Sequence, residues 1–284
     1  MSDEAYDAAL DILRRLDPKS ISNNLSNICR LQPELASDLL ASVDKPLKSL
    51  ICKKTGKEFL CCDYNRDGDS YRSPYSNDYI NESDGSIVPF DDEAPLPSKH
   101  LRELELIAND SFDIYRDLYY EGGISSVYLW DKEDGDATND GKLGFDGVVL
   151  IKKTVDNNSS WDSIHVFEIE YKQGSESIYR VTSTIILDLS NDLTKSTKLN
   201  STYLSGNLTR QTEKTVSFKD STTHIANIGS IIEDVEIQMR NMLQEVYFGK
   251  TKDVLSDIRS LEALPQRNEA KQRQESLINK FENL

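Results

Sequence analysis

The polar loop at residues 63–74 comes closest to a metal site in its residue types and spacing. Asp63, Asn65 and Asp67 alternate with other residues and precede a glycine, as in the first half of a calcium-binding EF-hand loop. An EF-hand requires a bidentate glutamate at its last position, where this chain has Pro74, and its loop follows a helix rather than a strand. The sequence therefore favours a turn-rich loop held by side-chain hydrogen bonds over a calcium site.

Residues that could support catalysis are few. The three histidines are His100, His165 and His224, and none lies in an HExxH zinc spacing or accompanies a GxSxG nucleophile. His165 falls in an alternating segment, which favours a hydrogen-bonded sheet residue over a general base. The glycines around residue 144 are three apart, which matches neither common nucleotide-binding fingerprint. We expect no catalytic residue, no metal ligand and no cofactor, and hence no enzyme.

Composition and charge restrict the possible partners. The 284 residues include 33 Lys and Arg against 49 Asp and Glu, a net charge of −16. Such a chain repels phosphate backbones, so nucleic acid is not an expected partner. No apolar run approaches the roughly 18 residues of a membrane span, and the acidic start is unlike a signal peptide. We expect a cytoplasmic protein without a transmembrane segment, with reduced thiols at its four cysteines.

The elements that must position the polar loop begin with helices. Residues 1–46 carry the apolar stripes of three short helices joined by brief turns, which indicates a small antiparallel bundle. Residues 47–62 read as a hairpin and, with the polar loop, form the region 47–97. Within it, residues 77–97 are acidic and contain prolines, so we expect an irregular surface stretch there.

Residues 98–265 predict a helix, a sheet and a longer helix. Ser98 can cap a helix that runs to about Glu121, where two glycines end it. Candidate strands follow without intervening helices, typical of an antiparallel five-strand meander, at 124–131, 143–153, 161–171, 177–189 and 201–213. The segment 222–247 repeats apolar residues every three or four positions, which predicts a helix of about 39 Å that can lie across a sheet. The fold class is therefore α+β.

Residues 266–284 differ from the acidic body. From residue 248 onward, seven basic and six acidic residues leave a net charge of +1. The apolar residues of the tail fall on one side of a helix, and they include Leu277, Ile278, Phe281 and Leu284. Such a helix is typical of a partner-binding arm, but one that folds back onto its own body would show the same pattern. Periodicity alone leaves both interpretations open.

Several segments, taken in chain order, resemble the beta subunit of F-actin-capping protein. The most specific is Cys62–Pro74, which reads Cys-Asp-Tyr-Asn-Arg-Asp-Gly-Asp-Ser-Tyr-Arg-Ser-Pro. Further matching segments are Ser42–Lys48, Tyr115–Tyr119, Ser125–Asp131, Trp161–Val166, His224–Gly229 and Tyr247–Asp253. The matches run from about residue 1 to 265, so the chain is similar to members of this family over most of its length.

The resemblance implies a fold built from two chains. It implies an obligate heterodimer with a capping protein alpha subunit, in which residues 1–46 form part of a helical stalk. The strands of 98–265 would supply half of an antiparallel sheet shared between the subunits, with the long helix across it. Residues 266–284 would be an amphipathic actin-binding arm.

The resemblance also implies a function and its residues. The family's dimers occupy the barbed end of the actin filament and block subunit addition and loss, without calcium or nucleotide. The actin contacts expected here are Arg240, Arg259 and the arm residues Leu277, Ile278, Phe281 and Leu284. Gln238 departs from the lysine that animal members tend to carry. Phosphoinositides and stalk-wrapping peptides are the expected regulators, with Asp44 as a candidate contact, and the expected location is the cortical actin cytoskeleton.

Two other interpretations stay open. The chain could belong to a complex at the end of an actin-related filament, as in dynactin, which co-purification would distinguish. It could instead be a calcium-binding or enzymatic protein that uses the 63–74 loop, which calorimetry with calcium would test. The single most informative experiment is expression of the chain alone and together with an alpha subunit.

Overall fold

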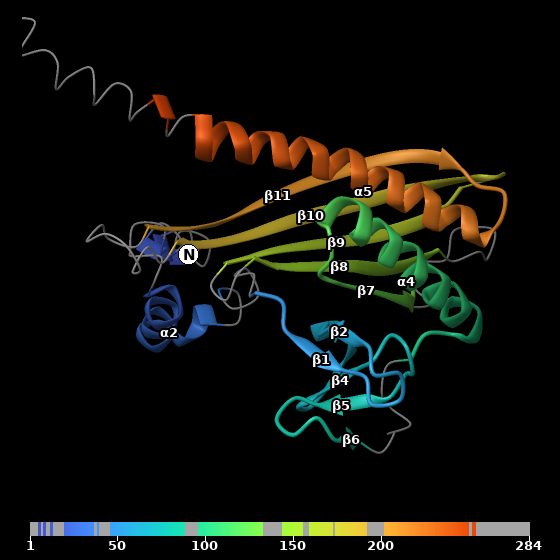
Figure 1. Ribbon diagram of the computed structural model, residues 1–284, viewed down its shortest axis with the longest axis horizontal. Helices are drawn as coiled ribbons and strands as arrows, with labels where there is room; N and C mark the ends of the chain where they lie inside the picture. The colour runs from blue at the N-terminus through green and yellow to red at the C-terminus, as the bar shows by residue number, and fades with distance from the viewer. Residues whose placement is uncertain are drawn as a thin grey trace, which may run out of the picture. The chain divides into compact units, whose positions relative to one another are not determined.

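The computed structural model describes residues 20–36, 46–88, 96–132, 144–155, 159–172, 174–191 and 202–249, with a few positions elsewhere. The chain divides into two compact units, Met1–Ile232 and Glu233–Leu284. The first unit holds all the described strands and the first part of the long helix (Figure 1).

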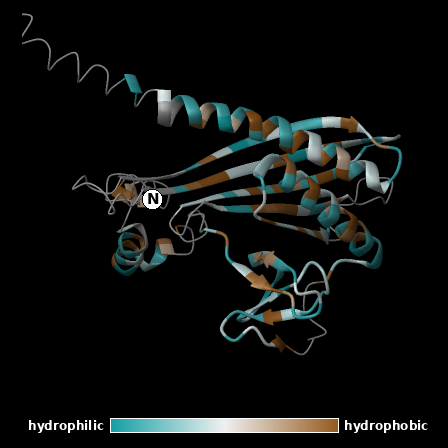
Figure 2. Cartoon of the chain, viewed as in Figure 1, coloured by the Kyte–Doolittle hydropathy of each residue, from teal (hydrophilic) through white to brown (hydrophobic). Residues whose placement is uncertain are grey.

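An antiparallel sheet of five strands, in the order β11-β10-β9-β8-β7, forms the centre of the first unit. The strands are β7 (Ile124–Asp131), β8 (Phe145–Val155), β9 (Ser159–Tyr171), β10 (Glu176–Asn191) and β11 (Thr202–Ser217). Each strand pairs with its neighbour in the chain, so the predicted meander is confirmed. Apolar and polar residues alternate along the strands (Figure 2), because successive side chains point to opposite faces of a sheet.

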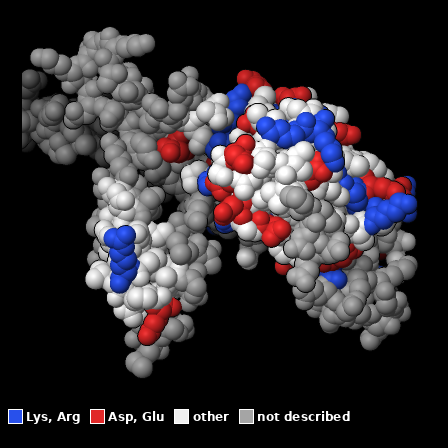
Figure 3. Space-filling view, turned by 90° about the horizontal axis from the view of Figure 1, so that it is seen from below, with Lys and Arg blue, Asp and Glu red and all other residues white. Residues whose placement is uncertain are grey.

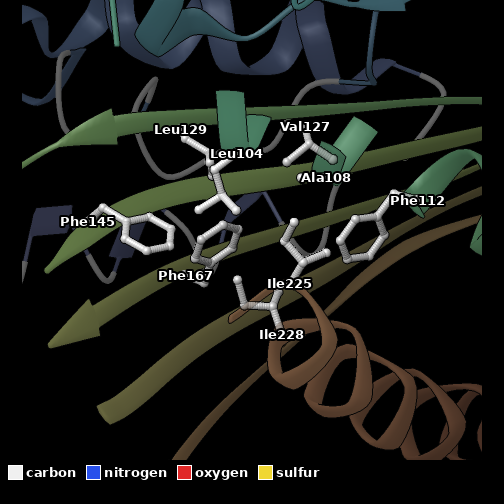
Figure 4. A pocket seen from close by; sticks show the side chains of 9 residues that line it. All are labelled: Leu104, Ala108, Phe112, Val127, Leu129, Phe145, Phe167, Ile225 and Ile228. Carbon is white, nitrogen blue, oxygen red and sulfur yellow. The ribbon is translucent and has the colours of Figure 1, made fainter. Parts of the chain in front are cut away.

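Helix α4 (Lys99–Tyr120) and the start of α5 (Ser221–Leu243) cover one face of this sheet. Their side chains meet those of the strands around a space of only about 10 Å³ (Figure 4), lined by Leu104, Ala108, Phe112, Val127, Leu129, Phe145, Phe167, Ile225 and Ile228. This region is therefore a packed core and not a ligand pocket. Both predicted helices are confirmed, and α5 continues into a π-helical turn, η5 (Gln244–Gly249).

Strands β1 (Ser49–Ile51) and β2 (Glu58–Leu60) form the hairpin predicted for residues 47–62. It packs on the opposite face of the sheet. The backbone N–H of Leu60 donates to Ser126 Oγ at 2.9 Å, and the Tyr128 hydroxyl donates to the Leu60 carbonyl at 2.6 Å. Apolar side chains complete this contact, namely Leu60, Tyr128, Val148 and Leu150. The hairpin therefore covers the β7 side of the sheet.

A small sheet follows, made of β3 (Arg66–Asp67), β4 (Ser70–Arg72), β5 (Tyr79–Asn81) and β6 (Ile87–Val88). The prediction of an irregular stretch at 77–97 is wrong for β5 and β6. Tyr79 and Ile80 are 3% and 1% exposed, so this part of the stretch belongs to a core. The strands have two or three residues each, which is too short for a two-residue period to stand out from the surrounding polar sequence.

The N-terminal region contributes helix α2 (Ile21–Leu31) and a short 3₁₀ turn, η2 (Pro33–Leu35). Leu25, Leu35 and Leu39 bury their side chains in one cluster with Ala9 and Leu13. Packed apolar stripes agree with the predicted bundle, although many of residues 1–46 lie outside the described part of the chain. Among the described residues, no helix combines the length and apolarity needed to span a lipid bilayer.

His224 sits where α5 begins on the sheet, only 1% exposed and surrounded by aromatic rings. Its Nδ1 lies 2.7 Å from the Tyr179 hydroxyl, which accepts a hydrogen bond from Asn227 Nδ2 at 2.9 Å. This contact joins β10 to the start of α5, and the tautomer of the imidazole decides which of the two atoms donates. Burial lowers the pKa of His224 to about 4, and the charge of Asp220 opposes this only in part.

This buried imidazole predicts an acid-sensitive fold. In the unfolded chain His224 binds a proton below about pH 6.5, whereas in the folded protein it binds one only near pH 4. The free energy of unfolding should therefore fall as pH drops from about 6.5 to 4, by roughly 3 kcal/mol in total. Urea unfolding at several pH values measures this slope, and His224→Gln should flatten it.

His100→Gln, at an exposed position of α4, is the matched control and should leave the slope as it is. An unchanged slope in His224→Gln would contradict the assignment of the acid sensitivity to this residue.

Candidate functional site

Several polar side chains of the 63–74 loop form hydrogen bonds with other residues of the same loop. Asn65 is 2% exposed, and its side-chain oxygen accepts a hydrogen bond from Arg72 Nε at 3.1 Å. Asp63 accepts one from the Tyr71 hydroxyl at 3.3 Å. Among the described residues, no group of three or more His, Cys, Asp or Glu could hold a metal ion. These contacts favour a loop held by hydrogen bonds over a calcium site.

Arg72 is the centre of that hydrogen bonding, although it is completely buried. Its two terminal nitrogens donate to the two carboxylate oxygens of Glu105, each at 2.8 Å, and Glu105 is also 0% exposed. The same carboxylate accepts the backbone N–H of Leu129 at 2.8 Å and contacts Arg102. Burial acts to lower the pKa of Arg72, but the hydrogen bonds and charge of Glu105 outweigh it and raise that pKa.

The other chemical candidates from the sequence have structural roles. His165 is fully buried, and its Nδ1 lies 2.8 Å from Ser183 Oγ, which confirms the predicted sheet position. Gly147 is required by packing, because a Cβ there would lie 2.5 Å from Phe167 Cζ and 2.7 Å from the Tyr128 carbonyl oxygen. Strand β8 therefore passes so close to its neighbours at this position that a glycine is needed there. A bound nucleotide is not required to explain this residue.

Of the expected actin contacts, the structure describes Arg240 alone. Its side chain is 36% exposed, and its Nη2 lies 3.3 Å from an oxygen of Glu236, which is 2% exposed. Ile237, which directly follows Glu236 in α5, is 48% exposed. Arg259, Asp44 and the arm residues Leu277, Ile278, Phe281 and Leu284 lie outside the described residues.

Sequence reasoning did not single out Glu236 or Ile237. The spacing of four between Glu236 and Arg240 is the signal that could have indicated their ion pair. Glu236 lies among the apolar residues of α5, between the buried Val235 and Met239, so the periodicity of the helix did not indicate a polar role for it.

Comparison with known proteins identifies the family. A family model described as F-actin capping protein, beta subunit, matches residues 6–255. The chain belongs to this family. F-actin-capping protein subunit beta of Yarrowia lipolytica is 60% identical over 278 residues, which is 98% of each chain. The proteins of the same name from Candida glabrata and Saccharomyces cerevisiae are 52% identical over 288 residues (99% of this chain, 100% of the relative) and 54% identical over 265 residues (89% of each).

Membership in the F-actin capping protein family agrees with the absence of catalytic chemistry expected from the sequence. The family consists of actin-binding structural proteins and not of enzymes. The segment Cys62–Pro74 contains Arg72, which Glu105 binds, so its buried residues belong to the core of the first unit while others in it are exposed.

Charged side chains on the face shown in Figure 3 are of mixed sign across the part that the structure describes. Ion pairs also lie around the small sheet, including Lys48 with Glu82, Lys54 with Asp78 and Arg66 with Asp69. Exposed pairs of this kind contribute little to stability, because water and salt screen them. We therefore expect the buried pair of Arg72 and Glu105, and not these, to control the stability of this region.

Arg72→Met should lower the free energy of unfolding by about 3–5 kcal/mol, because it leaves the carboxylate of Glu105 buried without its main partner. Urea unfolding followed by tryptophan fluorescence measures this loss. Arg66→Met removes an exposed arginine from the same loop and should cost at most about 1 kcal/mol. Equal effects of the two substitutions would show that Arg72 does not have the role assigned to it.

Proposed function

We propose that this chain is the beta subunit of a heterodimer that caps the barbed ends of actin filaments. The observation that carries the proposal is the family match over residues 6–255, with relatives named for actin capping that align over nearly their full length. The mechanism is steric: the dimer occupies the terminal actin subunits and blocks both gain and loss. It requires neither calcium nor nucleotide, and it acts in the cytoplasm at cortical actin structures.

The open edge of the central sheet supports a heterodimer with a capping protein alpha subunit. Strand β11 pairs with β10 along 16 residues and has no partner among the described strands on its other side (Figure 1). None of residues 206–217 is buried. An unpaired edge about 50 Å long is a template for another strand and a hazard for aggregation, so proteins normally cover it. A strand of the alpha subunit would continue the sheet there.

The opposite edge of the sheet, formed by β7, is covered by other parts of this chain. Strand β7 has eight residues, and five consecutive ones, Ser125–Leu129, are buried. The β1–β2 hairpin binds this strand through Leu60, and the Tyr75 hydroxyl donates to the Ser125 carbonyl at 3.4 Å. This chain therefore protects one edge of its sheet by itself and leaves the other for a partner.

Actin contact is assigned to α5 and to residues 266–284. Arg240 offers a cation at a partly exposed position of α5, and Arg259 would extend the basic surface. Leu277, Ile278, Phe281 and Leu284 would enter an apolar groove of a terminal actin subunit. Burying four such side chains gives roughly 6–12 kcal/mol before the cost of ordering the segment, so the arm can dominate the dissociation rate.

Regulation is assigned to the N-terminal region. Residues 1–46 would form the stalk with the alpha subunit, and Asp44 would contact basic groups of stalk-wrapping peptides. Phosphoinositides are the second proposed class of regulator. The regions 47–97 and 98–265 would supply the body that carries the arm.

Deleting residues 266–284 should raise the dissociation rate from barbed ends at least about tenfold, a loss of roughly 1.4 kcal/mol. The measurement is pyrene-actin elongation from seeds, with the truncated and full-length chains each co-expressed with the alpha subunit. Leu277→Asp with Phe281→Asp should reproduce much of this loss. Gln272→Asp, on the other side of the predicted helix, is the control, and equally tight capping by the truncated dimer would refute the role of the arm.

Charge reversal at Arg240 should weaken capping several-fold, because it removes a cation from the proposed actin surface. The neighbouring Glu236 complicates Arg240→Glu, since that change would place two carboxylates together with one of them buried. The double variant Glu236→Gln/Arg240→Gln avoids this repulsion and should weaken capping while the heterodimer stays intact. Seeded elongation gives the capping affinity and size-exclusion chromatography gives assembly. Loss of the heterodimer in the double variant would contradict the placement.

A further inference from the structure

The outer side of α4 carries an uncovered apolar row. Ile107, Ile114 and Leu118 are 46%, 63% and 73% exposed. They are spaced seven and four residues apart, so their side chains lie along one line of the helix. Single exposed apolar residues are ordinary, but three in line on one helix form a continuous strip. The core-facing side of the same helix is already filled by its own apolar residues, so the row adds nothing to the packing of the first unit.

An acidic row runs beside the apolar one. Glu103, Asp110 and Asp117 are exposed and recur every seven residues, on the line next to Ile107 and Ile114. Arg116 donates to Asp117 at 2.8 Å and to Asp113 at 3.0 Å. It therefore offsets part of the negative charge at the Asp117 end of the row. Glu103 and Asp110 form no ion pair with any residue that the structure describes. The row therefore keeps a net negative charge.

We propose that this α4 face, formed by the apolar row and the acidic row together, docks a basic amphipathic helix of a partner protein. The repeat of seven residues matches the spacing at which one helix packs along another, and the acidic row selects lysine and arginine at its border. A second copy of this chain fits poorly, because two acidic rows would meet. An anionic membrane surface fits poorly for the same reason. The inference stands on α4 alone and does not depend on actin capping.

The probe is a fluorescent peptide of three heptads with leucine at positions a and d and lysine elsewhere, and its match carries glutamate in place of lysine. Anisotropy titration against the full-length protein with its partner subunit, in about 0.15 M salt, measures binding. We expect the lysine peptide to bind and the glutamate peptide not to bind. Ile114→Asp/Leu118→Asp should weaken binding of the lysine peptide at least about tenfold.

The control is Ile51→Asp/Ile87→Asp, which adds the same two negative charges at exposed apolar positions of strands β1 and β6. Non-specific attraction to an acidic protein would be unchanged or increased in both double variants, so only docking on α4 predicts a loss in one of them. Glu103→Gln/Asp110→Asn should weaken binding several-fold and reduce its dependence on salt. Circular dichroism checks the folding of every variant.

A photo-crosslinking residue at position 111, between the apolar side chains, identifies the occupant directly. Crosslinks to the lysine peptide support the proposal. Equal binding by the two aspartate double variants would overturn it. A crosslink into residues 266–284 or into the second subunit would show that the face is already covered, and would also overturn it. Seeded actin elongation should be the same for Ile114→Asp/Leu118→Asp and the unmodified protein, which separates this proposal from the proposed capping function.

Discussion

The buried pair of Arg72 and Glu105 is the interaction on which the rest of the first unit depends. A guanidinium and a carboxylate that are both removed from water are tolerated only when their hydrogen bonds are satisfied. Here the partners come from three elements, because β4 supplies Arg72, α4 supplies Glu105 and β7 supplies the backbone N–H of Leu129. The pair therefore fixes the segment Cys62–Pro74, helix α4 and strand β7 relative to one another. A segment rich in polar residues can thus reflect a buried network as much as a surface contact.

That network explains why the two edges of the sheet differ. With α4, the small sheet and the hairpin all fixed around β7, this edge is closed within one chain. Strand β11 has no such cover among the described residues, and this difference is the physical basis for proposing a second chain at that edge. In the proposed heterodimer, part of the core would be completed between the two subunits. The lean apolar content of the sequence, 37%, agrees with that proposal.

Sequence reasoning succeeded where a periodic pattern was long. The strands β7–β11 and the helices α4 and α5 repeat apolar residues over many positions, and their predicted ranges are correct to within a few residues. It failed at β5 and β6, which are too short to show a period. It could not find Arg72 with Glu105, because their contact joins positions 33 residues apart that share no pattern. The family and its function came from residue identities, since periodicity contains no information about actin.

Two spaces between side chains in the described part of the first unit differ in size and polarity. The space beneath α4 and α5 is about 10 Å³. The larger hollow lies on the open face of β9–β11, and Arg180 fills its polar part through contacts with Glu213 at 2.9 Å and Glu170 at 3.1 Å. Neither space is lined by one of the buried polar atoms that lack a hydrogen-bond partner among the described residues. The partners proposed for this chain accordingly dock on an edge strand or on a helix face, namely on β11, on α5 and on α4.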